Sequence, residues 1–500
     1  MPGMRLLDRG KNAEAVAFFQ EYVADLPDDP EGYFGLAAAL SRLGKLEGPM
    51  AAVRKAVEAG LPAERFVAGP RHLFEALVAT EAFQAFYEEH GSPLVHGPML
   101  GCVSDTAARF WVRTARPSEV QVVVSAESPA KEPIRSPAVR TKEATDFTAV
   151  AAVKGLKPDT RYTYQVLVDG KPGLGAELPV FRTFPPAGGP GKFAVAFGGG
   201  AGYVPPHERM WDTIRERDPR ALLLLGDNVY IDHPKSELIQ RYCYYRRQSR
   251  PEFRRLTAAA AVYAIYDDHD FGTNDCVPGP EADEPAWKLE VWRVFRQNWN
   301  NPGYGGGIEM LPGCWFDFAV ADVHFILLDG RYYRSNPRKP KASMLGPSQK
   351  QWLLERLAGS KATFKVLCSP VPWASGTKPG SLDTWDGFPE EREEILAFIE
   401  RHRIGGVFLL SADRHRSDVW KLEREVGYPL YEFESSRLTN QHRHGSIPKA
   451  LFSFNARQSF GLLEFDTTKA DPTVTYRILD IDGEEVHAFT LARSQLTPRP

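Results

Sequence analysis

The chain has 500 residues, too many for one ordinary hydrophobic core, so we expect two or three domains. Its composition, 43% hydrophobic and 25% charged, is that of a globular protein and not of a disordered or fibrous one. With 61 basic and 64 acidic residues, the net charge of −3 provides no general attraction for nucleic acid or for an anionic membrane. Any bound anion must therefore be attracted locally, by metal ions or by a few arginines.

The sequence as written contains no recognisable export or membrane segment. No run approaches the roughly 20 apolar residues that span a bilayer. Residues 1–10 have neither the apolar core of a signal peptide nor a twin-arginine pair. We expect a cytoplasmic protein if the chain is complete, and otherwise leave the compartment open. The five cysteines are scattered and form no CxxC pair, which argues against a disulfide framework or a structural zinc site.

Residues 1–92 have the pattern of packed helices, because small and large apolar side chains alternate at helical spacing. A pattern that resembles a tetratricopeptide repeat runs through Tyr33, Leu36, Ala37, Leu43 and Gly44. The segment holds about one and a half such units, whereas an independent array needs about three. We therefore expect a helical cap on the rest of the protein, with a groove for a protein partner as the alternative.

Residues 93–187 consist of short alternating runs, such as 109–113 and 161–168, separated by Gly and Pro. The Asp169-Gly170 pair is a strong hairpin signal. Such a pattern is typical of a small antiparallel sandwich. No His, Cys or carboxylate cluster with catalytic spacing occurs there, so we expect a structural role.

A Pro/Gly linker at 185–191 leads into the largest unit, residues 188–500. Continuous apolar runs alternate there with helical stretches, as in strands that are covered on both faces. These runs are 193–197, 222–225, 262–266, 325–328, 365–368 and 407–410. We expect the late alternating strands to build a second sheet; they are 461–465, 474–479 and 486–491.

Four of the buried runs are followed directly by polar clusters, at 226–230, 267–275, 329–334 and 411–416. In open α/β sheets the loops at the carboxyl ends of the strands meet at one edge, where ligands bind. Grouping so many carboxylates costs desolvation free energy unless a cation joins them. We therefore expect a cation at this edge, with arginines beside it.

The donor types narrow the chemistry of that cation. Carboxylate and amide oxygens with imidazole suit Ca²⁺, Mn²⁺, iron or Zn²⁺, and argue against a soft copper site. Two ions about 3.5–4 Å apart would lower the pKa of a bound water and hold both oxygens of an in-line phosphoryl displacement. Arginines could hold the phosphate oxygens bidentately. The sequence therefore predicts a metal-dependent phosphoesterase, although each cluster alone also fits a turn, a charged loop or an ion pair.

With these clusters, residues 93–495 resemble the alkaline phosphatase D (PhoD-like) branch of the metallophosphatases. The matching blocks, in the family's order, are 226–230 (GDNVY), 267–270 (DDHD), 329–334 (DGRYYR), 369–373 (SPVPW) and 411–415 (SADRH). The sandwich segment also resembles the family's N-terminal domain, at 97–101 (GPMLG) and 109–113 (RFWVR). The helical N-terminus lies outside the resemblance.

The resemblance implies an α/β fold with a four-layer αββα metallophosphatase domain at 188–500. The small β-sandwich at 93–187 and the TPR-like helical segment at 1–92 would precede it. It also implies hydrolysis of small phosphate mono- or diesters at a site with two or more metal ions, which are Ca²⁺ and Fe³⁺ in the family. No nucleic acid and no membrane is implied as a partner.

The family blocks also assign roles to individual residues. Asp227 would bridge the metal ions and Tyr230 would bind one as a phenolate. The other metal ligands would be Asn274, Asp413 and His415. Beside the metals, Asp268 and His269 would orient water or assist the leaving group. Arg331 would hold phosphate or brace the acidic loops.

One position departs from the family. Gly200 stands where the family has a cysteine that binds ferric iron, and glycine offers no ligand. Mn²⁺ or Zn²⁺ is therefore an alternative to iron. A tyrosine with a pKa of about 10 needs a strongly polarising ion to bind as phenolate, so Tyr230 could instead hydrogen-bond a metal-bound water. The glycine loop could also let backbone N–H groups approach phosphate.

A catalytically weakened binding or scaffold protein is the alternative to an enzyme. In that interpretation the N-terminal helices recruit a protein partner and the carboxylates hold one structural Ca²⁺. The missing cysteine favours it. The retained set of Asp227, Asn274, Asp413 and His415 favours an enzyme, which is the leading interpretation.

Overall fold

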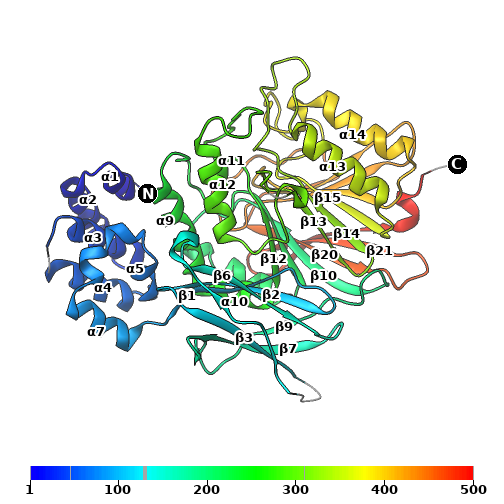
Figure 1. Cartoon of the computed structure of the whole chain (residues 1–500). Coiled ribbons are helices and arrows are strands. Elements are labelled where there is room, and N and C mark those ends of the chain that lie inside the picture. Colours follow the sequence, from blue (N-terminus) through cyan, green and yellow to red (C-terminus); the bar gives the residue numbers. More distant parts are fainter. Residues whose placement is uncertain (1, 46, 128–131, 309, 499–500) are drawn as a thin grey trace.

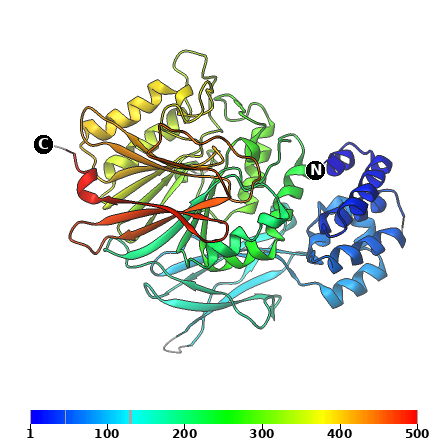
Figure 2. The ribbon, with the colours of Figure 1, turned by 180° about the vertical axis from the view of Figure 1, so that it is seen from behind.

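The computed structural model describes residues 2–45, 47–127, 132–308 and 310–498. A group of helices, a small β-sandwich and a large two-sheet unit follow one another along the chain (Figure 1). Seen from behind, the helical group again lies to one side of the other two (Figure 2). The boundaries expected at 92/93 and 187/188 fall between regular elements.

The N-terminal group consists of short helices packed in succession. They are α1 (Pro2–Asp8), α2 (Asn12–Asp25), α3 (Pro30–Arg42), α4 (Glu47–Glu58), α5 (Glu64–Ala68), α6 (Glu75–Val78) and α7 (Glu81–His90). The Asp29 side chain caps α3 by accepting from the backbone N–H of Glu31 at 3.0 Å. Gly35 lets α3 approach α2, since a Cβ there would lie 2.1 Å from the Phe19 ring. The repeat assignment and the protein-partner groove stay predictions.

The sandwich consists of two small antiparallel sheets. One contains β1 (Leu94–Gly101), β2 (Ala107–Thr114) and β6 (Thr148–Lys154). The other is built on β3 (Glu119–Ala126) and β7 (Arg161–Val168), with the short strands β4 (Ile134–Arg135), β5 (Val139–Arg140), β8 (Lys171–Pro172) and β9 (Val180–Arg182). Phe110 of the first sheet packs against Tyr164 of the second, with ring centroids 4.6 Å apart.

One buried carboxylate, Asp146, joins the three parts of the chain. Arg71 from the helical group, Arg113 from β2 and Arg241 from α9 (Glu237–Gln248) all form ion pairs with it. The Arg113 and Arg241 contacts measure 2.9 and 2.7 Å, and the Tyr245 hydroxyl donates to the same carboxylate at 2.6 Å. Burial alone would raise the pKa of Asp146, but the three guanidinium groups hold it at about 2.

Two sheets form the centre of the large unit. The first has the order β12-β11-β10-β20-β21-β22 and the second β13-β14-β15-β16-β18-β17-β19. The first consists of β10 (Lys192–Gly198), β11 (Ala221–Leu225), β12 (Ala261–Ile265), β20 (Ser459–Asp466), β21 (Thr473–Asp480) and β22 (Glu485–Ala492). The second consists of β13 (Phe316–Val320), β14 (Val323–Leu327), β15 (Phe364–Cys368), β16 (Val407–Ser411), β17 (Ser417–Leu422), β18 (Leu430–Ser435) and β19 (Phe452–Phe454).

The sheets pack face to face through aromatic side chains. The ring centroid of Phe465 in β20 lies 5.9 Å from that of Phe325 and 6.0 Å from that of Phe364, and both of these residues belong to the second sheet. Phe433 of β18 stacks on Tyr476 of β21 at 4.6 Å. Every residue of β11, β12, β14, β15 and β16 is buried, as the continuous apolar runs predict.

The prediction that the late strands build the second sheet is wrong. Strand β20 pairs antiparallel with β10, so β20, β21 and β22 extend the first sheet. Phe193 and Phe465 stack across that pairing at 5.0 Å. Burial alternates along β21, whereas β20 is buried at most positions. An alternating pattern therefore does not indicate which sheet these strands join.

Helices lie on the outer faces of the two sheets. On the side of the second sheet lie α13 (Gly346–Gly359) and α14 (Pro389–Arg401) (Figure 1). On the other side lie α9, α10 (Pro251–Ala259), α11 (Asp268–Phe271) and α12 (Trp287–Asn298). Helix α8 (Met210–Arg215) packs against α10. The expected mixed α/β fold is thus confirmed. Among the described residues, none of the helices combines the length and apolar character that a transmembrane span requires.

Candidate active site

Polar residues that follow β11, β12 and β16 meet around a pocket of about 400 Å³. The neighbours β10, β11 and β12 are parallel, as are β14, β15 and β16, so each sheet directs its carboxyl ends to one edge. The predicted site residues that line the pocket are Tyr230, Asp268, His269, Asn274, Asp413 and His415. The structure therefore brings most of the predicted set together, from loops separated by nearly two hundred positions in the sequence.

Asp227 lies directly behind this lining, in the turn that ends β11. Its side chain is 1% exposed, and its backbone has a φ of +53°. Gly226 makes the turn possible, because its φ of +107° favours glycine and a Cβ there would lie 2.5 Å from Asp267. The Tyr230 hydroxyl donates to Asp227 Oδ2 at 3.0 Å. Burial, and then the charge of Asp227, raises the pKa of Tyr230 well above its ordinary value.

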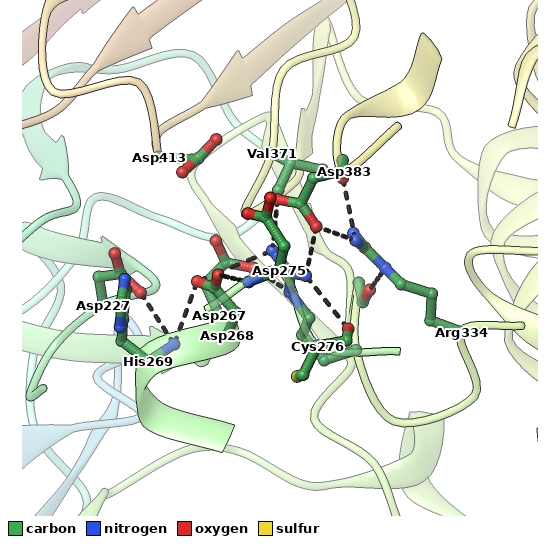
Figure 3. A network of polar contacts seen from close by, with 12 residues as sticks. Asp227, Asp267, Asp268, His269, Asp275, Cys276, Arg334, Val371, Asp383 and Asp413 are labelled. Carbon is green, nitrogen blue, oxygen red and sulfur yellow. Dashed lines mark hydrogen bonds and ion pairs between the residues drawn. The ribbon is translucent and has the colours of Figure 1, made fainter. Parts of the chain in front are cut away.

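The aspartates after β12 differ in whether they face the pocket. Asp270 accepts from the backbone N–H groups of Val229 at 2.9 Å and Asn228 at 3.2 Å, which fixes the Asp227 turn. Asp267 is held by Arg331 Nε at 2.5 Å. Asp268 remains to face the pocket (Figure 3).

The His269 ring also faces the pocket and is oriented from behind. Its Nδ1 lies 2.6 Å from Asp232 Oδ1, and its ring lies over Tyr230 at 4.5 Å. Burial acts to lower the pKa of His269, but the charge of Asp227 and the hydrogen bond with Asp232 raise it to about 10. Asp232, two residues beyond Tyr230, was not predicted, although its place in the same loop is the signal that could have found it.

The opposite wall follows β16, where two residues adopt left-handed backbone conformations. Asp413 has a φ of +71° and His415 a φ of +50°, which for residues other than glycine marks local strain. Arg414 Nη1 lies 3.1 Å from Asp413 Oδ2 and keeps the pKa of Asp413 low despite its burial. In Figure 3 the Asp413 carboxylate faces the group that contains Asp227 and Asp268.

The loop after β18 adds two imidazoles that were not predicted. His415, His442 and His444 form a triangle with ring centroids 4.8 to 5.2 Å apart. The Nε2 atoms of His442 and His444 lie 3.1 Å apart, near the roughly 3.3 Å between two nitrogens bound to one tetrahedral zinc. Burial lowers the pKa of His415 to about 3 and that of His444 to about 4, so both rings are neutral donors at pH 7. The His-x-His spacing is the sequence signal that could have found them.

The donor set fits metal ions. Ligand atoms of Asp227, Asp268 and His269 lie within 4.8 Å of one another. Burial, and then the charge of Asp268, raises the pKa of Asp227 well above its ordinary value, so a nearby cation would relieve a real electrostatic cost. His415 Nδ1 is buried and has no hydrogen-bond partner among the described residues. The site thus combines crowded carboxylates with an unused imidazole nitrogen.

Residues 193–450, more than half of the chain, match the PhoD-like phosphatase family. The chain belongs to the PhoD-like phosphatase family. Residues 91–179, which contain most of the sandwich, match a domain of unknown function (DUF7800). The helical group precedes both matched segments.

Known proteins of this kind resemble the chain to different extents. Alkaline phosphatase D of Bacillus subtilis (strain 168) is 33% identical over 237 residues, which are 41% of this chain and 40% of that protein. The chain thus aligns with about two fifths of the length of that relative. The structure of PhoD superposes with a TM-score of 0.67 at 18% identity, over 82% of this chain and 92% of that one. The structure of purple acid phosphatase PPD1 from yellow lupin (Lupinus luteus) seeds superposes with a TM-score of 0.59 at 12% identity, over 80% of this chain and 75% of that one.

These structural similarities establish the fold. The structure also shows the surroundings of Gly200, the position at which the chain departs from the PhoD-like pattern. Gly200 has a φ of +69°, and a Cβ there would lie 3.0 Å from Ser436 Oγ. Its N–H donates to the Gly226 carbonyl at 3.3 Å, and the N–H of Ala201 donates to the Asp227 carbonyl at 2.7 Å. These two N–H groups are therefore already used by the fold and are not free to bind phosphate.

Arg331 lies apart from the pocket of this PhoD-like site. It is fully buried, and besides Asp267 it holds Asp383 through Nη1 at 2.6 Å and Nη2 at 3.0 Å. Arg334 pairs with the same Asp383, a residue that was not predicted (Figure 3). Of the two roles expected for Arg331, these contacts support the bracing of the acidic loops and not the binding of phosphate.

Proposed function

We propose that this chain is a metal-dependent phosphoesterase that hydrolyses small phosphate mono- or diesters. The observation that carries the proposal is the pocket in which Asp268, His269, Asn274 and His415 converge, with Asp227 directly behind it, in a member of a phosphatase family. A pocket of this size, lined mostly by charged and polar side chains, suits a phosphate group better than a large apolar ligand.

We assign the metal ligands to Asp227, Tyr230, Asn274, Asp413 and His415. Bound there, metal ions would lower the pKa of a coordinated water and neutralise charge on the phosphate. The thiolate of the family is absent at Gly200, whereas His442 and His444 stand beside His415. We therefore favour Zn²⁺ or Mn²⁺ over the Ca²⁺ and Fe³⁺ that the resemblance implies, because Fe³⁺ would lack its thiolate ligand and imidazole is a poor ligand for Ca²⁺.

His269 is suited to deliver a proton to the departing alcohol. Asp232 holds its Nδ1–H, so the proton on Nε2 is the one available to the leaving-group oxygen. The hydrogen bond with Asp232 acts to raise the pKa of His269 and so favours the protonated ring that this role requires. Asp268, whose carboxylate accepts the His269 backbone N–H at 3.1 Å, lies where it can orient the attacking water.

Two cations of the lining were not predicted and suit the phosphate oxygens. Lys378 lies at the edge of the pocket, with Nζ 2.8 Å from Asp275 Oδ1. Arg414 lies in the wall beside Asp413. Both can give up part of their contact with a carboxylate to a phosphate oxygen, since each bond exchanged is charge-assisted.

The test compares variants of two site residues with matched controls. Asp227→Asn should lower kcat/KM for a chromogenic phosphate ester at least about a thousandfold, because a bridging ligand loses its charge. His269→Gln should lower kcat more for an ester of a poor leaving group than for nitrophenol, which needs no proton. Asp218→Asn and His402→Gln, both at exposed positions, should change neither. Unchanged turnover in Asp227→Asn would show that the site is misplaced.

A further inference from the structure

A second pocket, of about 380 Å³, lies between the N-terminal helices and the large unit. Residues of α1, α2 and α3 form one side, and residues of α9 and of the loops after β10 and β18 form the other. Tyr230 and Asn440 line both this pocket and the metal pocket, so the two spaces adjoin. Neither family match includes the helices that build its outer side.

Aromatic rings dominate the chemistry of this second pocket. Phe18 and Tyr22 of α2 stack with centroids 6.1 Å apart on one side. Tyr203 and Tyr242 lie on the other, with the Arg246 guanidinium 4.1 Å from the Tyr203 ring and 5.1 Å from the Tyr242 ring. Flat rings and a guanidinium plane form the type of surface on which an aromatic ligand stacks.

Two carboxylates supply hydrogen-bond acceptors at the same place. Asp29 Oδ2 accepts from the Tyr22 hydroxyl at 2.7 Å. Glu31 is 7% exposed, and its Oε1 lies 3.4 Å from Arg65 Nε. Its Oε2 is buried and lacks a hydrogen-bond partner within the described part of the chain. Asp29 and Glu31 both line the pocket, so an N–H group of a ligand would meet carboxylate acceptors there.

The helices are fixed against the large unit, so the pocket is a built feature. The Ser236 hydroxyl donates to Asp8 of α1 at 2.7 Å. The Arg65 guanidinium lies between Phe34 of α3 and Tyr242 of α9, 3.9 and 5.2 Å from their rings. The helical wall therefore stands in one position relative to Tyr230 and the metal pocket.

We propose that the N-terminal helices form the binding site for the organic group of the substrate, and that this group is an aromatic ring that carries an N–H donor. The inference rests on the proposed function, because the phosphate must occupy the metal pocket while the ring occupies the aromatic one. Tyr230 and Asn440 line both pockets, so one substrate can place its phosphate in the metal pocket and its ring in the aromatic pocket. The substrate is then an aromatic phosphate ester, and the helical group determines specificity without taking part in the chemistry.

The activity test uses the full-length, metal-loaded protein with two esters. Phe18→Ala should lower kcat/KM for β-naphthyl phosphate about tenfold and leave that for β-glycerol phosphate within about twofold. Tyr203→Leu, on the opposite wall, should likewise lower the ratio of kcat/KM for β-naphthyl phosphate to kcat/KM for β-glycerol phosphate. Tyr33→Ala, in α3 but outside the pocket lining, should not. An equal fall for both esters, or an unchanged ratio in a variant whose thermal unfolding matches the wild type, would overturn the proposal.

A binding test separates failure of the pocket from failure of the proposed function. Titration calorimetry with aminonaphthol and with naphthol, neither of which carries phosphate, needs no turnover. We expect both to bind, aminonaphthol several-fold more tightly, and both to weaken in Phe18→Ala. Such binding without hydrolysis of any ester would refute the enzyme and keep the aromatic site. Hydrolysis that does not distinguish the two esters, without binding of either naphthol, would refute the aromatic site alone.

Discussion

Replacing Asp146 by Asn should weaken the junction at which the three parts of the chain meet. In the folded protein the pKa of Asp146 is about 2, against 3.8 for an ordinary aspartate. That difference is worth about 2.4 kcal/mol of folding free energy at neutral pH, at about 1.36 kcal/mol per pKa unit. Arg113, fully buried, would also lose its charged partner, so we expect a total loss of about 2–4 kcal/mol.

The assay is urea unfolding followed by circular dichroism, for wild type, Asp146→Asn and the exposed control Asp28→Asn. Because the pKa of Asp146 is depressed in the folded state, its contribution is complete above about pH 4 and is lost as pH falls toward about 2. The difference in the free energy of unfolding between wild type and Asp146→Asn should therefore become smaller below about pH 4. A difference in unfolding free energy of less than about 0.5 kcal/mol at pH 7, or a difference that grows on acidification, would refute the reasoning.

Three further predictions concern the candidate site. Arg331→Lys should cost about 3–5 kcal/mol in urea unfolding, because lysine cannot hold two carboxylates as the planar fork does, but should leave KM unchanged; a raised KM would restore a phosphate-binding role. Gly200→Cys should destabilise by about 1–2 kcal/mol and bind no additional iron, since the positive φ disfavours a side chain that would meet Ser436; added iron by mass spectrometry would contradict this. His444→Ala should raise the dissociation constant for Zn²⁺ or Mn²⁺ at least about tenfold, while His402→Ala should not; equal affinities would remove the imidazole cluster from the metal shell.

Local pattern and strand order predicted the site well where the signal lies beside a buried strand. Asp227 and Asp413 lie two residues beyond β11 and β16, two strands that are buried at every position. Parallel pairing places each aspartate at the carboxyl-end edge of its own sheet, and the packing of the two sheets brings these edges together. The family blocks then extended the set to Tyr230, Asn274 and His415.

Long-range pairing was not predictable in the same way. The pairing of β20 with β10 joins segments more than 250 positions apart, and an alternating pattern specifies a buried face but no neighbour. His442 and His444 escaped notice because β18, which precedes their loop, carries buried Glu432 and Glu434 and so lacks an apolar run. The aromatic pocket joins residues 18–31 to residues 203–246, and no local sequence signal links those two segments.

The central claim, that the polar pocket is a metal-dependent phosphoesterase site, is tested most directly by metal content and hydrolysis measured on the same sample. The protein is stripped with a chelator, reloaded with Zn²⁺, Mn²⁺, Ca²⁺ or Fe³⁺, and assayed with chromogenic phosphate mono- and diesters. We predict two or more ions per chain, with turnover that disappears on stripping and returns on reloading with Zn²⁺ or Mn²⁺. At most one ion per chain, with no hydrolysis of either ester under any reloading, would contradict the claim.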